Sequence, residues 1–268
     1  MIYLFSFFMC LTAYSLLSIG FVLMKKGIEW IGWKGKKNRK FYSNLFLWLA
    51  GFFVMNIYGV PSAIALKILT PHVVSAFAGW GIIVLVVFSY FLLKEKIFRT
   101  DYIFSVLIVA GIFLLNFFEK SNSFENSTSL LGIIFLSMIP IILFFYGFYK
   151  KLSFRIKAVI FASVSGMAAG LMVLFLRLLM LKFGYKVSLF FSSEYLYLYI
   201  MFALLSFIAL QFALKAGDMI AIGPTQYSVN IIYPVFASLM VFGQLINIIQ
   251  VLSLGLIVYS VINILKKH

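Results

Sequence analysis

Nine apolar runs, each about 20 residues long, follow one another along this sequence. An α-helix needs a run of that length to cross the hydrocarbon core of a bilayer. Because 64% of the residues are hydrophobic and only 11% are charged, the composition predicts a polytopic all-α membrane protein rather than a soluble domain. The predicted spans are residues 2–24, 41–62, 71–93, 101–118, 129–149, 158–181, 195–214, 220–241 and 246–265.

The basic residues fall on one side of this predicted topology. Of the 22 Lys and Arg residues, 17 lie in one set of alternate connections, four lie in the other set, and Arg177 lies inside a span. By the positive-inside rule the N-terminus is outside and the C-terminus is cytoplasmic, and we expect the plasma membrane. The net charge of +15 is thereby explained without a nucleic-acid partner. The expected partners are the lipid bilayer and a small solute or ion, with a homodimer left open.

The odd number of spans and a short internal similarity predict an inverted repeat. Residues 65–67 and 213–215 both read Ala-Leu-Lys, and each triplet precedes a proline-containing apolar run. We expect two four-helix repeats of opposite orientation, residues 1–118 and 158–268, joined by a linking span within residues 119–157. Inverted repeats with a site at their interface are a common plan of secondary transporters.

The stretch 211–244 combines high hydrophobicity with a row of polar side chains. Gln226, Asn230 and Tyr233 are spaced to share one helix face. Pro224 suits a first helical turn, whereas Pro234 lies inside the run and is expected to kink or break it. Polar groups on such a helix are tolerated in lipid where they face protein or water. Two interpretations remain open, a transport site and hydrogen-bonding contacts between packed helices.

Four short motifs are spread over the chain. They are Gly20-Phe-Val-Leu-Met-Lys-Lys-Gly27, Asn56-Ile-Tyr58, Ser89-Tyr-Phe-Leu-Leu-Lys-Glu95, and the series Gln211, Ala213-Leu214, Pro224 and Tyr227. Together they resemble the drug/metabolite transporter (DMT) superfamily, and the nine-span NIPA type of magnesium transporter more than the ten-span EamA type. The family usually has Lys-Glu where this chain has Gly243-Gln244.

The resemblance implies a secondary transporter that moves a small solute by alternating access, with Mg²⁺ as the transported ion. One alternative is an exporter or exchanger of a small organic metabolite or drug. A second alternative is a non-transporting membrane subunit or scaffold. No P-loop, HExxH or protease pair is present in the sequence, so we expect neither an enzyme nor a resident cofactor. Transported Mg²⁺ and a coupling proton are the inorganic species that such a transporter would carry. The sequence assigns no metal ligands.

Charged groups inside the predicted spans are scarce. All seven acidic residues lie at span ends or in loops, so a cation path would depend on carbonyls, amides and hydroxyls. Glu95 and Asp218 are each expected to be solvated charges beside lysines, although they adjoin the repeated elements. Arg177 is close enough to the outer end of its span to snorkel, and otherwise could pair with an anionic solute.

The remaining candidates are polar residues placed where they could face a path. His72 and Ser75 follow Pro71 at the start of the third span, where a histidine could relay protons. Gly166 and Gly170 form a GxxxG pattern, which favours close helix packing over a site. The residues expected to bind the solute are Tyr14, Asn56, His72, Ser75, Arg177, Gln211, Gln226, Tyr227, Asn230 and Tyr233.

Overall fold

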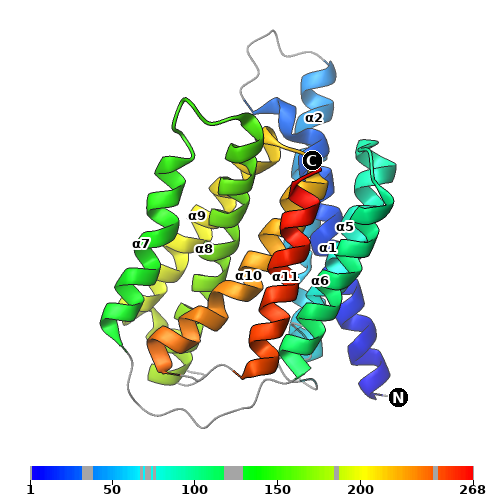
Figure 1. The fold of residues 1–268 in the computed structure, drawn as a ribbon. Coiled ribbons are helices and arrows are strands. Elements are labelled where there is room, and N and C mark those ends of the chain that lie inside the picture. The colour runs from blue at the N-terminus through cyan, green and yellow to red at the C-terminus, as the bar shows by residue number, and fades with distance from the viewer. Residues whose placement is uncertain are drawn as a thin grey trace. The chain divides into compact units, whose positions relative to one another are not determined.

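The protein is all-helical throughout the part of the chain that the structure describes (Figure 1). The computed structural model describes residues 2–31, 39–66, 69, 74, 77–117, 129–183, 187–243 and 247–267. Five of its helical stretches have the length and apolarity needed to cross a membrane, namely Tyr3–Trp30, Arg39–Ala65, Phe154–Phe183, Glu194–Ala216 and Ile248–Leu265. Two shorter apolar stretches are Ala78–Leu93 and Leu130–Tyr146. The chain therefore has the helix lengths of an integral membrane protein, while the count of nine crossings remains a prediction.

Helix occupies each of the nine apolar runs. The α-helices are α1 (Ile2–Gly27), α2 (Arg39–Ile57), α3 (Gly59–Leu66), α5 (Ala78–Phe88), α6 (Arg99–Phe117), α7 (Leu130–Tyr146), α8 (Phe154–Phe183), α9 (Glu194–Ala216), α10 (Met219–Phe242) and α11 (Ile248–Leu265). Shorter turns are the 3₁₀-helices η1 (Ile28–Trp30) and η3 (Val187–Ser192) and the π-helix η2 (Ser89–Leu93).

Three proline positions differ from the sequence expectation. Pro224, expected in a first helical turn, is the sixth residue of α10. The run 41–62 is divided into α2 and α3 at a turn on Tyr58, because Pro61 has no N–H with which to bond the carbonyl of Ile57. By contrast, α10 is continuous from Met219 to Phe242, so the predicted alternative of a break at Pro234 is wrong. Packing of α10 against the neighbouring helix α8, described below, offsets the single backbone hydrogen bond that Pro234 cannot make.

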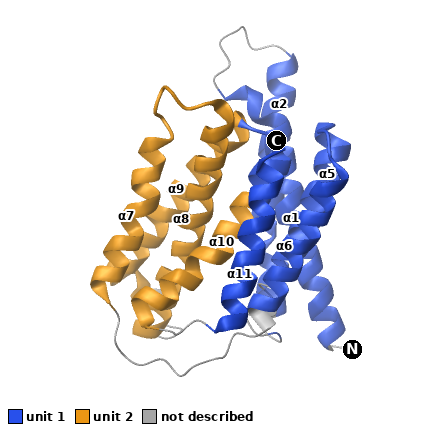
Figure 2. Cartoon of the chain, in the orientation of Figure 1, with its two compact units in different colours: residues 1–119, 217–224, 247–268 blue, residues 120–216, 225–246 orange. Residues whose placement is uncertain are grey.

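The chain forms two compact units whose membership crosses the linear sequence (Figure 2). Unit 1 comprises residues 1–119, 217–224 and 247–268, and unit 2 comprises residues 120–216 and 225–246. Helix α10 therefore begins in unit 1 and continues in unit 2. This division is defined by contacts, whereas the predicted repeats 1–118 and 158–268 are defined by sequence similarity and stay a prediction.

In unit 1, α1 packs against α2, α3 and α5, and α11 packs against α6. Glycine sets the closeness of the α1–α2 pair, since a Cβ on Gly20 would lie 2.8 Å from the carbonyl oxygen of Gly51. Small residues at such contacts let helix backbones approach and gain van der Waals packing where lipid offers no hydrophobic driving force.

In unit 2, α8 packs against α7 and α9. Its apolar core includes Phe175 and Phe202, whose stacked rings lie 5.6 Å apart between centroids. Tyr233, Ala237 and Val241 of α10 belong to the same core. The second half of α10 is thus held by apolar burial, which fixes the direction of the polar side chains it carries.

Candidate functional site

The polar row of α10 is buried within unit 2. Gln226 is 6% exposed and Tyr227 is 2% exposed, while Asn230 is half-buried. The side-chain oxygens Gln226 Oε1 and Asn230 Oδ1 are both buried and have no hydrogen-bond partner in the described part of the chain. Residues four apart in a helix are neighbours on its surface, so two unpartnered side-chain oxygens lie one turn apart on α10.

Two glycines of α8 bring its backbone against this face of α10. A Cβ on Gly166 would lie 2.6 Å from the main-chain oxygen of Gln226 and 3.0 Å from the nitrogen of Asn230. A Cβ on Gly170 would lie 2.9 Å from Pro234 Cδ. The expected role of the GxxxG pattern in close packing is confirmed, because both glycines of α8 lie directly against α10.

Pro234 adds a further acceptor at the same place. A proline nitrogen carries no hydrogen, so the main-chain carbonyl of Asn230, four residues earlier, lacks its helical donor. The side-chain oxygen of Asn230, Oδ1, is one of the two unpartnered atoms described above. Asn230 therefore combines a side-chain acceptor without a partner and a carbonyl without its helical N–H.

Tyr233, the third member of the row, has a defined partner. Its hydroxyl is buried and donates to the main-chain oxygen of Leu136 on α7, at 2.6 Å. Pro140 of α7 cannot donate to that carbonyl, so the Tyr233 hydroxyl replaces the missing helical donor. In the structure Tyr233 joins α10 to α7, whereas Gln226 and Asn230 keep free acceptors.

The other predicted site residues that the structure describes lie on elements of both units. Tyr14 and Asn56 belong to unit 1, where the ring of Tyr14 is 6.1 Å from that of Tyr58 and Asn56 donates to the Phe52 carbonyl of its own helix at 2.7 Å. In unit 2, Gln211 is half-buried on α9. His72 and Ser75 lie outside the described residues.

Arg177, the predicted partner of an anionic solute, lies on α8 with its guanidinium 4.9 Å from the centre of the Phe242 ring. A cation over an aromatic face is stabilised by the ring quadrupole. Arg177 thus contributes to the contact between α8 and the end of α10 within unit 2.

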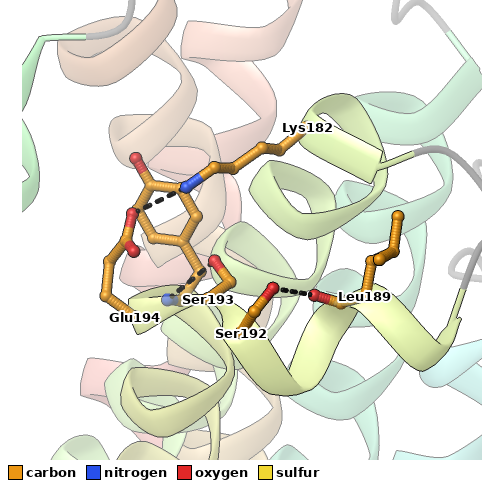
Figure 3. A network of polar contacts seen from close by, with 6 residues as sticks. Lys182, Leu189, Ser192, Ser193 and Glu194 are labelled. Carbon is orange, nitrogen blue, oxygen red and sulfur yellow. Dashed lines mark hydrogen bonds and ion pairs between the residues drawn. The ribbon is translucent and has the colours of Figure 1, made fainter.

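The described acidic residues are paired or at helix ends. Figure 3 shows Lys182 directed at Glu194 at the start of α9, with an Nζ–Oε1 distance of 3.1 Å. Glu29 accepts from Lys40 at 3.3 Å, and both side chains are largely exposed. Within the described residues no group of three or more His, Cys, Asp or Glu side chains comes together as a metal site.

Glu95 has a role that the sequence did not reveal. It is half-buried, and both of its carboxylate oxygens accept hydrogen bonds from main-chain N–H groups at the start of α10. The expectation of a solvated charge is therefore wrong for Glu95, whereas Asp218 is exposed as expected. The contact joins residues that are 124 positions apart, and no local sequence pattern marks such a contact. The sequence offered one signal for the role of Glu95, which was its position at the end of a repeated element.

Comparisons with protein-family models, curated proteins and solved structures found no match in any of the three. The geometry of α10 and its neighbours therefore carries the functional proposal.

Proposed function

We propose that this protein is a secondary transporter that moves a small solute by alternating access. The supporting observation is the pair of buried, unpartnered side-chain oxygens of Gln226 and Asn230 on α10. An unsatisfied polar atom away from water costs about 1–3 kcal/mol. A fold that retains two of them one turn apart, on a helix that also carries Pro234, has the features of a ligand-binding site.

The alternative of hydrogen-bonding contacts between packed helices has less support at these two residues. Such contacts would give Gln226 and Asn230 partners on a facing helix. In the described part of the chain the two side-chain oxygens have no such partner. The scaffold alternative has the same difficulty, since a scaffold gains nothing from unsatisfied amides and would be more stable with apolar residues there.

The chemistry of the site favours a cation or a solute with several hydrogen-bond donors. Gln226 Oε1, Asn230 Oδ1 and the carbonyl freed by Pro234 are all acceptors. Hydrated Mg²⁺, which keeps several of its waters, could donate to them through those waters. An organic ammonium or polyol could donate directly. Mg²⁺ is the solute that the NIPA resemblance implies, and an organic metabolite is the second candidate.

The transport mechanism follows the plan of inverted-repeat carriers. Two bodies are needed for rocking around a fixed site, and the chain forms two compact units. We propose membership of the DMT superfamily, with an outside N-terminus, a cytoplasmic C-terminus and nine spans. The motifs and charge distribution of the sequence support these points.

The test is solute-induced stabilisation of the purified full chain. A ligand that binds only the folded state raises the melting temperature, by an amount that grows with its concentration above Kd. Mg²⁺, organic ammonium compounds, amino acids and organic anions would be compared at matched ionic strength. We expect a shift from Mg²⁺ or from an ammonium solute that disappears in Asn230→Leu and Gln226→Leu.

Asn263→Leu is the matched control, because Asn263 is a half-buried asparagine on α11 whose side chain donates to the Tyr259 carbonyl of its own helix. The control should keep the full solute-induced shift. A shift that survives in Asn230→Leu and Gln226→Leu would remove these residues from the site. A shift from organic anions alone would contradict the acceptor chemistry, and no shift from any solute would contradict transport.

A further inference from the structure

A pocket of ≈ 410 Å³ opens in unit 1 where α6 begins and α11 ends. Two segments far apart in the sequence line it, the connection between η2 and α6 and the residues that follow α11. Lys267 joins these segments, because its ammonium donates to the Thr100 hydroxyl and lies 5.8 Å from the centre of the Phe98 ring. Helices α6 and α11 also pack against each other (Figure 1). The pocket is therefore built by helix packing rather than by a single loop.

Three lysines line this pocket, namely Lys94, Lys96 and Lys267. The side chains of Lys94 and Lys96 are exposed, and their ammonium groups have no ion pair or hydrogen bond within the described part of the chain. Lys94 also has left-handed backbone with φ of 57°, alone among the described non-glycine residues. Such backbone is strained for a residue with a Cβ and is concentrated at ligand-binding and catalytic sites. The pocket thus offers two ammonium groups that the described protein leaves unused.

The two acidic residues of the pocket are offset by other groups. Glu95 Oε1 accepts from the N–H of Met219 at 2.8 Å, and Glu95 Oε2 accepts from the N–H of Ile220 at 3.1 Å. This carboxylate is therefore already bound at the positive end of the α10 dipole. The ammonium of Lys25 interacts electrostatically with both Glu95 and Asp218. The groups that remain for a ligand are the lysines.

Two more basic residues flank the pocket. Arg99 begins α6 and Lys266 follows α11, and both side chains are exposed. Asp101, the acid in the first turn of α6, is fully buried, and its Oδ2 accepts from the main-chain N–H of Phe98 at 2.8 Å. Five basic side chains thus gather at one end of the α6–α11 pair. A surface of this sign attracts an anionic ligand.

The pocket lies at the level where lipid headgroups are expected. Helix α11 has the length and apolarity of a membrane span and ends at Leu265, two residues before Lys267. The end of an apolar span marks the boundary between the hydrocarbon core and the headgroups. Close to the pocket, α6 and α11 expose apolar side chains such as Ile103 and Ile262. A phosphate in the pocket and acyl chains along these two helices would fit one molecule.

We propose that this pocket binds the phosphate group of an anionic phospholipid, with Lys94, Lys96 and Lys267 as donors to the phosphate oxygens. Lysine binds phosphate as a compact charge, and clustered lysines at a membrane surface attract anionic lipids. Lys267 is held in place by Thr100 and Phe98, so less side-chain freedom is lost when the lipid binds. The acyl chains lie along the exposed apolar side chains of α6 and α11. This site does not rest on the proposed transport function.

Lipid-induced stabilisation of the purified full chain in detergent tests the proposal. Phosphatidylglycerol, phosphatidylcholine and free glycerol phosphate would be titrated separately, and an apparent Kd taken from the concentration dependence of the melting temperature. We expect phosphatidylglycerol to bind roughly tenfold or more tightly than phosphatidylcholine, whose choline cancels the phosphate charge. Glycerol phosphate has the charge without acyl chains, and it should give no shift at the concentrations where the lipid saturates.

Replacement of the three lysines by glutamine, in Lys94→Gln, Lys96→Gln and Lys267→Gln combined, should weaken phosphatidylglycerol binding roughly hundredfold. Each lysine near an anionic surface contributes a factor of about five. Replacement of the same three residues by arginine keeps the charge and should keep the binding. Lys96→Gln alone should weaken binding about fivefold. It removes an exposed side chain without a described partner, so the fold is retained in this variant.

The matched control is the combination Lys150→Gln, Lys151→Gln and Arg155→Gln. These exposed residues belong to unit 2, and their replacement removes the same amount of charge away from the pocket. The control should keep the wild-type Kd for phosphatidylglycerol. An equal loss of binding in the control would show a general basic surface and overturn the site.

Three other outcomes would overturn the proposal. They are stabilisation of equal strength by phosphatidylcholine, stabilisation of equal strength by glycerol phosphate, and no stabilisation by phosphatidylglycerol. Asn230→Leu, which alters the proposed solute site, should leave phosphatidylglycerol binding unchanged. Lipid binding that depends on the pocket lysines, together with no stabilisation by any transported solute, would remove transport and leave the lipid site standing.

Discussion

The hydroxyl of Tyr233 on α10 donates to the main-chain carbonyl of Leu136 on α7 at 2.6 Å. That carbonyl is the one to which Pro140 cannot donate, because a proline nitrogen has no hydrogen. The pairing shows how an interrupted helix is tolerated in an apolar setting, where a freed carbonyl must find another donor. Among the three polar residues on this face of α10, Tyr233 is therefore hydrogen-bonded to another helix, whereas the side-chain oxygens of Gln226 and Asn230 have no described partner.

Tyr233→Phe should lower the free energy of unfolding by about 1 kcal/mol, the scale of a hydrogen bond between helices in a membrane protein. In a Pro140→Ala background residue 140 regains an N–H, so the same change should cost close to nothing. A double-mutant cycle by denaturing-detergent titration measures this coupling. Tyr259→Phe, at an exposed tyrosine, is the control. Equal costs in both backgrounds would contradict the proposed replacement of one donor by the other.

Asn230→Leu should raise the stability of the solute-free protein by about 1 kcal/mol, because it removes a buried acceptor that has no partner. The same substitution is expected to abolish solute-induced stabilisation. A gain in stability together with a loss of function is common when a binding-site residue is replaced. Asn263→Leu on α11, where the side chain bonds its own helix, should change stability by less than about 0.5 kcal/mol. Destabilisation by Asn230→Leu would instead indicate that the amide bonds a neighbouring helix.

Gly166→Ala should destabilise the protein by about 1–3 kcal/mol, the usual cost of overpacking a close contact. The new Cβ would meet the main-chain oxygen of Gln226 at 2.6 Å, and a backbone atom cannot move aside as a side chain can. Gly255→Ala on α11 is the matched control, since no atom lies within 4 Å of its Cβ position. There the better helix propensity of alanine should stabilise by up to about 1 kcal/mol. Thermal midpoints in detergent distinguish the two signs.

The contribution of Glu95 to the global stability of the protein should fall as the pH rises above 4.5, because burial raises the pKa of its carboxyl group. A carboxyl group whose pKa is raised in the folded state binds more protons folded than unfolded in that window, so its contribution to stability is full below 4.5 and is lost as pH rises through the raised value. The difference between wild type and Glu95→Gln isolates this contribution. A difference that grows with pH in favour of wild type would show that the N–H bonds dominate over burial.

Lys94→Gly should stabilise the protein by about 0.5–1 kcal/mol. Glycine avoids the steric cost of the left-handed backbone at this position, although it loses more chain entropy on folding. Lys96→Gly is the control, since positive φ among described non-glycine residues is confined to Lys94. It should be neutral or destabilising. Stabilisation of equal size in both variants would point to the removed lysine charge rather than to the backbone.

The helical fold was predictable because its signal is local. The apolar runs 158–181 and 195–214, for example, appear as helices α8 and α9, with ends within a few residues of the predicted ones. The close packing at Gly166 and Gly170 was predictable for the same reason, since glycines four residues apart share a helix face. Hydrophobicity does not predict the turn at Tyr58, because the apolar run 41–62 continues through Pro61 without a polar interruption that would mark a helix end.

The site was predictable only in part. Spacing alone grouped Gln226, Asn230 and Tyr233 on one helix face. It could not show that the Tyr233 hydroxyl is hydrogen-bonded whereas the amide oxygens of the other two residues have no partner in the described part of the chain. That distinction depends on the surroundings of α10 in the folded chain, where the Leu136 carbonyl of α7 accepts from Tyr233 and the two amide oxygens have no described partner. The solvated charge expected at Glu95 was wrong, because burial and its partners Met219 and Ile220 come from a distant segment.

The sequence by itself determined the class of this protein, because apolar length and proline or glycine position act on the residues around them. Only the tertiary structure decided which polar groups are satisfied. A hydrogen bond depends on distance and direction between atoms, and residues such as Glu95 and Met219 are brought together by packing of whole helices rather than by their neighbours in the chain.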